Sequence, residues 1–112
     1  MRIYSINIRC LLANIAEVIH HVELHDPHII LIQESWLNSS IEHVHIPNYS
    51  IISRRDRYDT ENRGGIIAFA KSHLRNIVHI SNIDIAERAW RYLHSDFGII
   101  AICNWYRPPG SP

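Results

Sequence analysis

Asn7, Glu34 and Tyr106 are polar side chains that end or follow apolar segments of the strand type. Glu34 raises the sharpest question, because the apolar residues Ile29–Ile32 lead directly into Gln33 and this carboxylate. Taking an unpaired carboxylate out of water costs several kcal/mol, so Glu34 needs a partner or solvent. Magnesium is one such partner, since Mg²⁺ prefers oxygen ligands and is often held by one or two carboxylates together with substrate phosphates. The alternative is that Glu34 begins a loop and faces solvent.

The apolar pattern predicts the elements that position these side chains. Alternation over Ile3–Ile8 predicts a strand, and three- and four-residue steps over Leu12–Val22 predict an amphipathic helix that ends at Asp26-Pro27. The segment His28–Gln33 predicts a strand buried on both faces. A strand, helix, strand unit favours a parallel pair with a right-handed crossover. Because ligands in open α/β sheets bind beyond the carboxyl ends of strands, the polar groups at these ends would then converge.

The rest of the chain is rich in strand patterns. Turn-rich stretches such as DTENRGG and HSDFG separate strand candidates at residues 49–54, 65–71, 76–80, 87–93 and 99–106. Gly64-Gly65 indicates a turn with positive φ before a strand. We interpret Trp36, Trp90 and Trp105 as packing residues.

Length and composition bound the possible classes. A chain of 112 residues with 46% hydrophobic and 20% charged residues indicates one packed domain and excludes a disordered tail. Eleven Lys and Arg balance eleven Asp and Glu, so net charge favours no class of partner. Cys10 and Cys103 are far apart and are expected as free thiols. Without a secretory h-region or a membrane-length apolar run, we expect an intracellular protein, nuclear or cytoplasmic, that is not secreted and has no membrane partner.

Basic residues cluster in one short segment. Arg54 ends the strand candidate at 49–54 and Arg55, Arg57 and Arg63 come after it, and arginine suits two-pronged phosphate contacts. They either track a DNA backbone or form a solvated hairpin, and both interpretations stay open. His21 and His25 have the four-residue spacing that can hold a metal, but without an HExxH pattern a solvated helix face is the better interpretation.

Five segments, taken in order, resemble one known family. They are INIRCLLANI, DPHIILIQESWL, IPNYSIISRRDR, RGGIIAFAK and ICNWYRPPG. Together they are similar to the first half of an endonuclease/exonuclease/phosphatase domain. The closest likeness is to the endonuclease domains of non-LTR retrotransposon polyproteins, which precede a reverse transcriptase.

The resemblance implies a fold, a cofactor and roles for individual residues. The family fold is a four-layered α/β sandwich, of which residues 1–112 would be a single partial domain: an α/β unit with a mixed sheet and a flanking helix, the second sheet missing. The family hydrolyses phosphate esters with Mg²⁺ or Mn²⁺, and the likeness implies DNA as partner. Glu34 would bind the metal, and Asn7 and Tyr106 would be catalytic, as an active-site amide and a phosphate-positioning hydroxyl. Asn104 and Arg107 would contact phosphate or DNA beside Tyr106.

The family pattern extends beyond the matched motifs. Family members continue to a Gly-Asp-Phe-Asn loop and to an Asp-His pair that activates water, so we expect this fragment to be inactive by itself. A non-catalytic remnant that keeps a nucleic-acid or protein binding surface is the alternative, and a phosphatase acting on small or lipid phosphates stays open within the enzyme class. Because the sheet would lack its cover, we expect a marginally stable chain that needs a complementary half-domain or associates with itself through an exposed sheet face.

Overall fold

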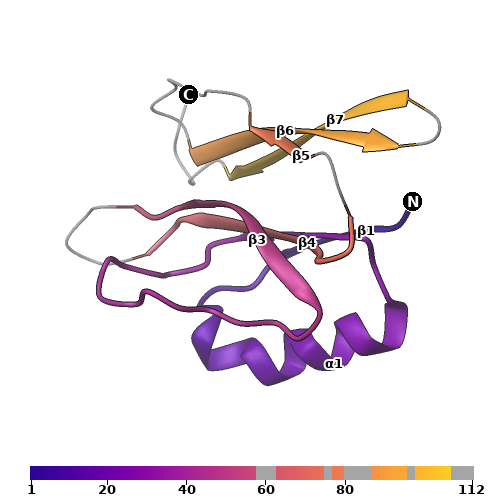
Figure 1. Ribbon diagram of the computed structural model, residues 1–112. Helices are drawn as coiled ribbons and strands as arrows, with labels where there is room; N and C mark the ends of the chain where they lie inside the picture. The colour runs from indigo at the N-terminus through magenta and orange to yellow at the C-terminus, as the bar shows by residue number, and fades with distance from the viewer. Residues whose placement is uncertain (58–62, 75–76, 80–86, 96–97, 107–112) are drawn as a thin grey trace.

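The computed structural model describes residues 1–57, 63–74, 77–79, 87–95 and 98–106. The chain forms three layers, with the helix on one side of a four-stranded sheet and a three-stranded sheet on the other (Figure 1). The elements in order are β1 (Ile3–Asn7), the short 3₁₀ turn η1 (Leu12–Asn14), α1 (Ile15–His25), β2 (Ile29–Gln33), β3 (Tyr49–Arg55), β4 (Ile66–Lys71), β5 (Ile77–His79), β6 (Glu87–Ser95) and β7 (Gly98–Tyr106). In this part of the chain, no helix is long and apolar enough to cross a membrane.

The first sheet is mixed and has the order β1-β2-β4-β3. β1 and β2 are parallel, with Asn7 opposite Gln33, as the strand, helix, strand pattern predicts. β4 runs antiparallel to both β2 and β3. The predicted α/β class with a mixed sheet and a flanking helix is therefore confirmed.

The helix covers one face of this sheet. Val18 and Val22 of α1 are buried against Ile30 and Ile32 of β2 and Phe69 of β4. The helix ends where Asp26 adopts a left-handed conformation (φ 47°) and its N–H donates to the Val22 carbonyl at 2.8 Å. Pro27 follows and disfavours further helix, as the sequence predicts. The predicted helical stripe begins at Leu12, whereas regular α-helix starts only at Ile15 after the 3₁₀ turn.

A second sheet covers the opposite face, which differs from the expectation that this layer is missing. β5, β6 and β7 form an antiparallel sheet, and its inward side chains Leu93 and Ile102 pack on β2 and β4. The apolar residues beneath them are buried: Ile29, Leu31, Ala68 and Ala70. The physical reason is alternation along β6 and β7, which gives this hairpin an apolar inner face of its own.

The second sheet leaves part of the first sheet exposed, and its own outer face carries exposed apolar side chains. Ile3 on the edge strand β1 is 47% exposed. On the outside of β6 and β7, Trp90, Tyr92, Ile99 and Trp105 are between 39% and 63% exposed. The interpretation of Trp90 and Trp105 as packed residues is therefore wrong, because their strand positions point away from the first sheet. Contiguous apolar surface of this kind is typical of a contact site.

Candidate functional site

Strand ends of the first sheet meet at one edge of the molecule. β1 and β2 end there with Asn7 and Gln33, and the antiparallel strand β4 begins there with Ile66. Arg55 pairs with Ile66 from the other side, so β3 also ends at this edge. With strands about 4.8 Å apart, the Cα atoms of Arg55 and Gln33 lie about 10 Å from each other.

The backbone around Glu34 is sharply turned. Glu34 has a left-handed conformation (φ 54°), which is uncommon for a residue with a side chain. Its carbonyl accepts from the Cys10 N–H at 3.0 Å, and the Ser35 N–H donates to the Gly65 carbonyl at 3.2 Å. Gly65 is itself left-handed (φ 84°), and a Cβ there would lie 2.8 Å from Ser35 Oγ. Close packing against this glycine therefore helps hold the turn, and the predicted positive φ before β4 is found.

The Glu34 carboxylate has a partner on each oxygen. The Tyr106 hydroxyl donates to Oε1 at 2.8 Å, which joins the end of β7 to the end of β2. Arg9 Nε lies 3.7 Å from Oε2, but that side chain is 80% exposed, so the ion pair contributes little. The Glu34 side chain is 16% exposed and remains accessible from the edge.

Asn7 lies beside this pair on the neighbouring strand. Its Cα partner in β2 is Gln33, the residue before Glu34, and Asn7 is exposed. Gln33 Nε2 donates to Ser5 Oγ at 3.1 Å and to Asn104 Oδ1 at 2.8 Å. The edge therefore carries a row of amide and hydroxyl groups next to the carboxylate.

Asn104 lies inside the molecule, which differs from the expectation that it contacts phosphate or DNA. It is 1% exposed, and its Nδ2 donates to the carbonyls of Ile32 at 3.2 Å and Ile67 at 3.1 Å. Both amide hydrogens are engaged by these carbonyls, and burial keeps the side chain from solvent. Arg107, the other residue predicted to flank Tyr106, lies outside the described residues.

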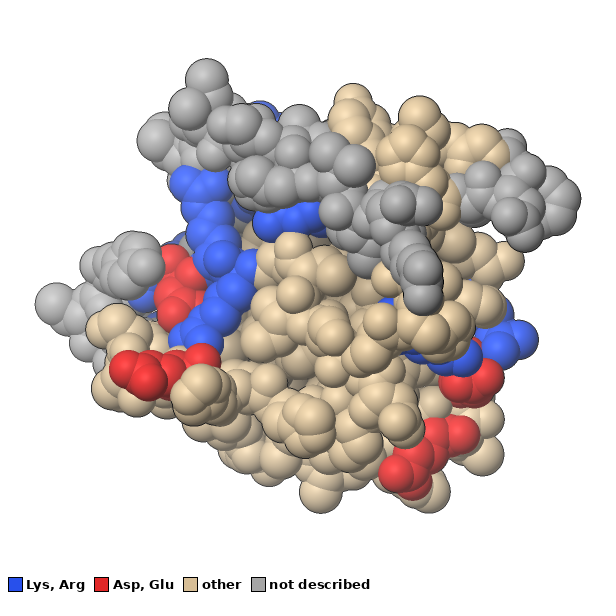
Figure 2. All heavy atoms as spheres, in the orientation of Figure 1, with Lys and Arg blue, Asp and Glu red and all other residues tan. Residues whose placement is uncertain are grey.

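Arg54 in the arginine segment has a structural role. Arg54 makes a two-pronged pair with Asp56, at 3.0 Å from Nε and 2.9 Å from Nη2, and also donates to the Asn38 carbonyl at 3.0 Å. Arg55 and Arg57 are half-buried. Figure 2 shows Lys and Arg side chains gathered at the end of the molecule where β3 ends and β4 begins.

Arg9 is a group at the site that was not assigned from the sequence. Arg9 reaches Glu34 because Arg9 and Cys10 both adopt positive φ (48° and 84°), which no glycine signals in advance. Arg63 stacks over Trp36 with its guanidinium carbon 5.3 Å from the ring centroid.

The oxygen donors at this edge suit a hard cation. Magnesium is commonly held by one or two carboxylates plus water and substrate phosphate, so the Glu34 carboxylate and the Asn7 amide form a compatible set. Across the described ranges, no group of three or more His, Cys, Asp or Glu is placed to hold a metal. His21 and His25 stack on α1 with centroids 6.3 Å apart, and His21 Nε2 lies 3.8 Å from a Glu17 oxygen.

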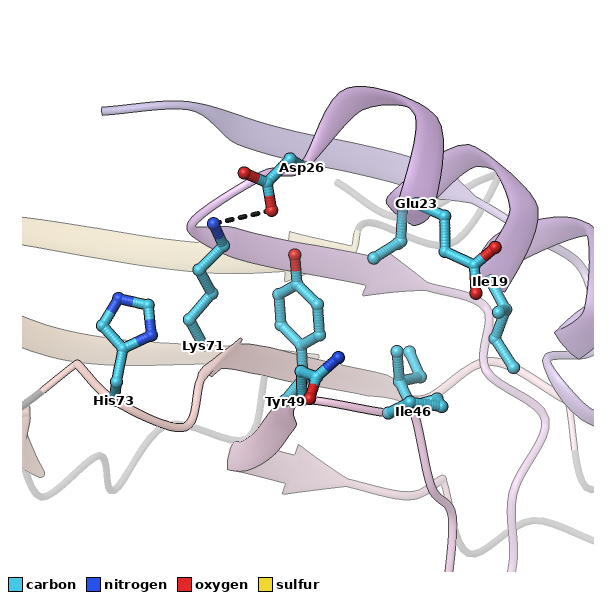
Figure 3. A pocket seen from close by; sticks show the side chains of 10 residues that line it. Ile19, Glu23, Asp26, Ile46, Tyr49, Lys71 and His73 are labelled. Carbon is cyan, nitrogen blue, oxygen red and sulfur yellow. Dashed lines mark ion pairs between the residues drawn. The ribbon is translucent and has the colours of Figure 1, made fainter.

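A cavity of about 350 Å³ lies at the opposite end of β4, between that strand, β3 and α1. Lys71 Nζ lies 2.7 Å from Asp26 Oδ1 in its wall (Figure 3). The hydrogen bond from Lys71 lowers the pKa of the Asp26 carboxyl. The hydroxyl of Tyr49, which also lines the cavity, donates to the Pro27 carbonyl. Because these polar groups satisfy one another, the cavity is a weaker candidate for chemistry than the edge at Glu34.

Comparison with known proteins identifies the fold. The sequence matches no family model and no curated protein. The structure is similar to the crystal structure of the AP endonuclease LMAP from Leishmania major, with a TM-score of 0.68 and 17% sequence identity. The alignment covers 94% of this chain and 39% of that protein, so this chain spans about two fifths of its length. The chain therefore has the fold of part of an AP endonuclease, an endonuclease/exonuclease/phosphatase-fold protein.

Proposed function

We propose that the edge at Glu34 is the metal- and phosphate-binding part of a phosphodiesterase that nicks DNA, of the kind found in non-LTR retrotransposon endonuclease domains. The observation that carries the proposal is the 2.8 Å hydrogen bond between Tyr106 and Glu34, which joins the ends of strands in two different sheets. The fold supports it, because the similar solved structure is named an AP endonuclease. The matched motifs at these two residues support the retrotransposon likeness.

Each group at the edge has a proposed role. Glu34 binds Mg²⁺ or Mn²⁺, and Asn7 on the adjacent strand presents its amide to the metal-bound phosphate. Such an ion would offset negative charge that develops on the phosphate oxygens. The Tyr106 hydroxyl positions the phosphate from the β7 side. Arg55 and Arg57 add positive charge at the same end, which favours a polyanionic backbone.

The roles proposed for these residues are to bind the metal and to orient the phosphate, and hydrolysis also requires a group that activates water. A water molecule must be activated as nucleophile, and the resemblance assigns that role to an Asp-His pair outside the matched motifs. We propose that the 112-residue chain binds the metal and DNA without turnover. A protein extended through the remainder of the domain nicks supercoiled plasmid in Mg²⁺.

Manganese binding to the chain tests the proposal directly. Glu34→Gln removes the carboxylate charge with little change in shape, so we expect Mn²⁺ affinity to fall at least about tenfold by calorimetry or electron paramagnetic resonance. Glu42→Gln is the matched control, because the Glu42 side chain is 81% exposed and lies in the loop before β3. Equal Mn²⁺ affinity in Glu34→Gln and the unaltered chain would refute the metal site. In the extended protein, Glu34→Gln abolishes nicking.

A non-catalytic binding module is the second candidate, and the bare outer face of β6 and β7 favours it. Trp105 lies there beneath the Arg88 guanidinium, 5.6 Å from the ring centroid. A binding module predicts DNA affinity that falls steeply with salt and does not depend on Mn²⁺. DNA affinity measured with and without Mn²⁺ separates the two candidates: the metal site predicts that Mn²⁺ strengthens DNA binding in the unaltered chain but not in Glu34→Gln, and the binding module predicts no effect of Mn²⁺ in either.

A further inference from the structure

Asn104 is a buried polar residue in the layer between the two sheets, beside apolar residues such as Ile102 and Leu31. It shares the inner face of β7 with Ile102, which packs on the first sheet, and its own exposure is 1%. Burying an amide is costly unless its hydrogen bonds are made. The structure makes these bonds, since Nδ2 donates to two carbonyls and Oδ1 accepts from Gln33 Nε2.

The two carbonyls belong to facing residues of different strands. Ile32 of β2 and Ile67 of β4 are Cα partners, so one side chain of β7 is tied to both strands at the same level. Apolar contact between sheets is non-directional and tolerates sliding. Hydrogen bonds of about 3 Å are directional and short, and a slide of β7 by one residue, about 3.4 Å, breaks all of them.

The spacing on the two strands links this tie to the candidate site. Asn104 contacts Ile32, and two residues further along each strand Tyr106 contacts Glu34. Fixing the first contact therefore sets how far along β2 the Tyr106 hydroxyl lies. A second tie between the sheets, Arg91 Nε to the Ile52 carbonyl at 2.6 Å, joins β6 to β3 and keeps the sheets docked away from this point.

We propose that Asn104 is a positioning residue: its buried hydrogen bonds fix the register of β7 on β2 and β4 and so hold the Tyr106 hydroxyl on the Glu34 carboxylate. Gln33, which donates to Asn104 Oδ1, assists it. The role of this contact in binding phosphate rests on the proposed function. The contact itself is measurable without metal or substrate.

A double-mutant cycle between Tyr106→Phe and Glu34→Gln, followed by urea unfolding, measures the contact. In the otherwise unaltered chain, we expect the unfolding equilibrium constants to show a coupling of about tenfold, typical of a partly exposed hydrogen bond to a carboxylate. In the Asn104→Ala variant we expect this coupling to disappear, so that the ratio of equilibrium constants is about one. Ile102→Ala is the matched control: it lies on the same face of the same strand, removes apolar contact and leaves the coupling intact.

Each outcome decides the proposal. Coupling that persists with Asn104→Ala, or that disappears equally with Ile102→Ala, overturns it, as does an absence of coupling in the unaltered chain. If Asn104→Ala does not fold, Gln33→Leu is used in its place, because this change removes one of the three hydrogen bonds of Asn104. A coupling free energy between Tyr106 and Glu34 that falls by about half supports the proposal, and an unchanged coupling free energy overturns it. Unchanged Mn²⁺ affinity in Glu34→Gln would refute the proposed function while leaving this positioning role standing.

Discussion

Replacement of Arg54 by glutamine tests whether the arginine segment is structural or binds DNA. Arg54 and Asp56 have side chains that are 19% and 7% exposed, and they are joined by two hydrogen bonds. Removing one partner of a buried pair typically costs about 3–5 kcal/mol, because the other charge is left uncompensated. The partial exposure of Arg54 lets water reach the site, so we expect a loss of about 2–3 kcal/mol.

Urea unfolding measures this loss. With a slope of about 1.5 kcal/mol per molar urea for a chain of this size, Arg54→Gln lowers the unfolding midpoint by about 1.3 to 2 M. Asp56→Asn added to Arg54→Gln costs little more, since the pair is already broken. Arg9→Gln is the control for stability: its side chain is 80% exposed, and we expect a change below about 0.5 kcal/mol.

DNA binding under folding conditions completes the test. We expect Arg54→Gln to leave the salt dependence of DNA affinity unchanged, whereas Arg55→Gln or Arg57→Gln lowers its slope by about one. An Arg54→Gln variant of unaltered stability but reduced salt slope would refute the structural role. Arg54 would then be a phosphate contact despite its pairing with Asp56.

Further predictions concern the two cores. Tyr49→Phe removes the hydroxyl that donates to the buried Pro27 carbonyl, so unfolding free energy drops by about 1–2 kcal/mol, whereas the exposed Tyr92→Phe changes it little. Burial raises the pKa of the Tyr49 hydroxyl, so as pH rises this hydroxyl loses its proton in the unfolded state before it does so in the folded state. The unfolding free energy therefore falls as pH rises above about 10, and it falls less in Tyr49→Phe. Urea titrations of both proteins at about pH 9 and 11 measure the two losses. Ile102→Ala leaves a cavity between the sheets and costs about 2–5 kcal/mol, checked by the same urea titration.

The spacing of apolar residues predicted most of the helix and strands, because each of these elements must bury a face and this requirement acts on residues close together in the sequence. The continuous apolar segment before Gln33 forms β2, which is covered on one face by α1 and on the other by the second sheet. The strand candidates at residues 87–93 and 99–106 are found as β6 and β7, but the sequence pattern does not predict that their inner residues cover the first sheet. That contact depends on how the second sheet packs on strands that are distant in the sequence, and the local spacing of apolar residues does not specify this packing. The second sheet was therefore missed although its strands were predicted.

The site was predicted less completely, for a different reason. Strand ends identify Glu34 and Tyr106 as polar groups at a sheet edge, and the structure brings them to 2.8 Å. The resemblance implies a phosphate contact for Asn104 beside Tyr106, and the arginine cluster leaves Arg54 open between a DNA contact and a solvated hairpin. Their actual partners, a carboxylate two residues away and two backbone carbonyls of the other sheet, follow from burial. Residue type alone does not distinguish these environments.

The candidate site is shared between the two sheets, and this has a consequence for how it is lost. Glu34 is held by backbone hydrogen bonds within the first sheet and its loops, such as the 3.0 Å bond from Cys10. Tyr106 is held at Glu34 only while β7 keeps its register on the first sheet, which we propose Asn104 fixes. Losing these hydrogen bonds therefore removes the phenol while the carboxylate keeps its place. Metal binding should survive such a change better than phosphate positioning, because the two functions depend on different layers.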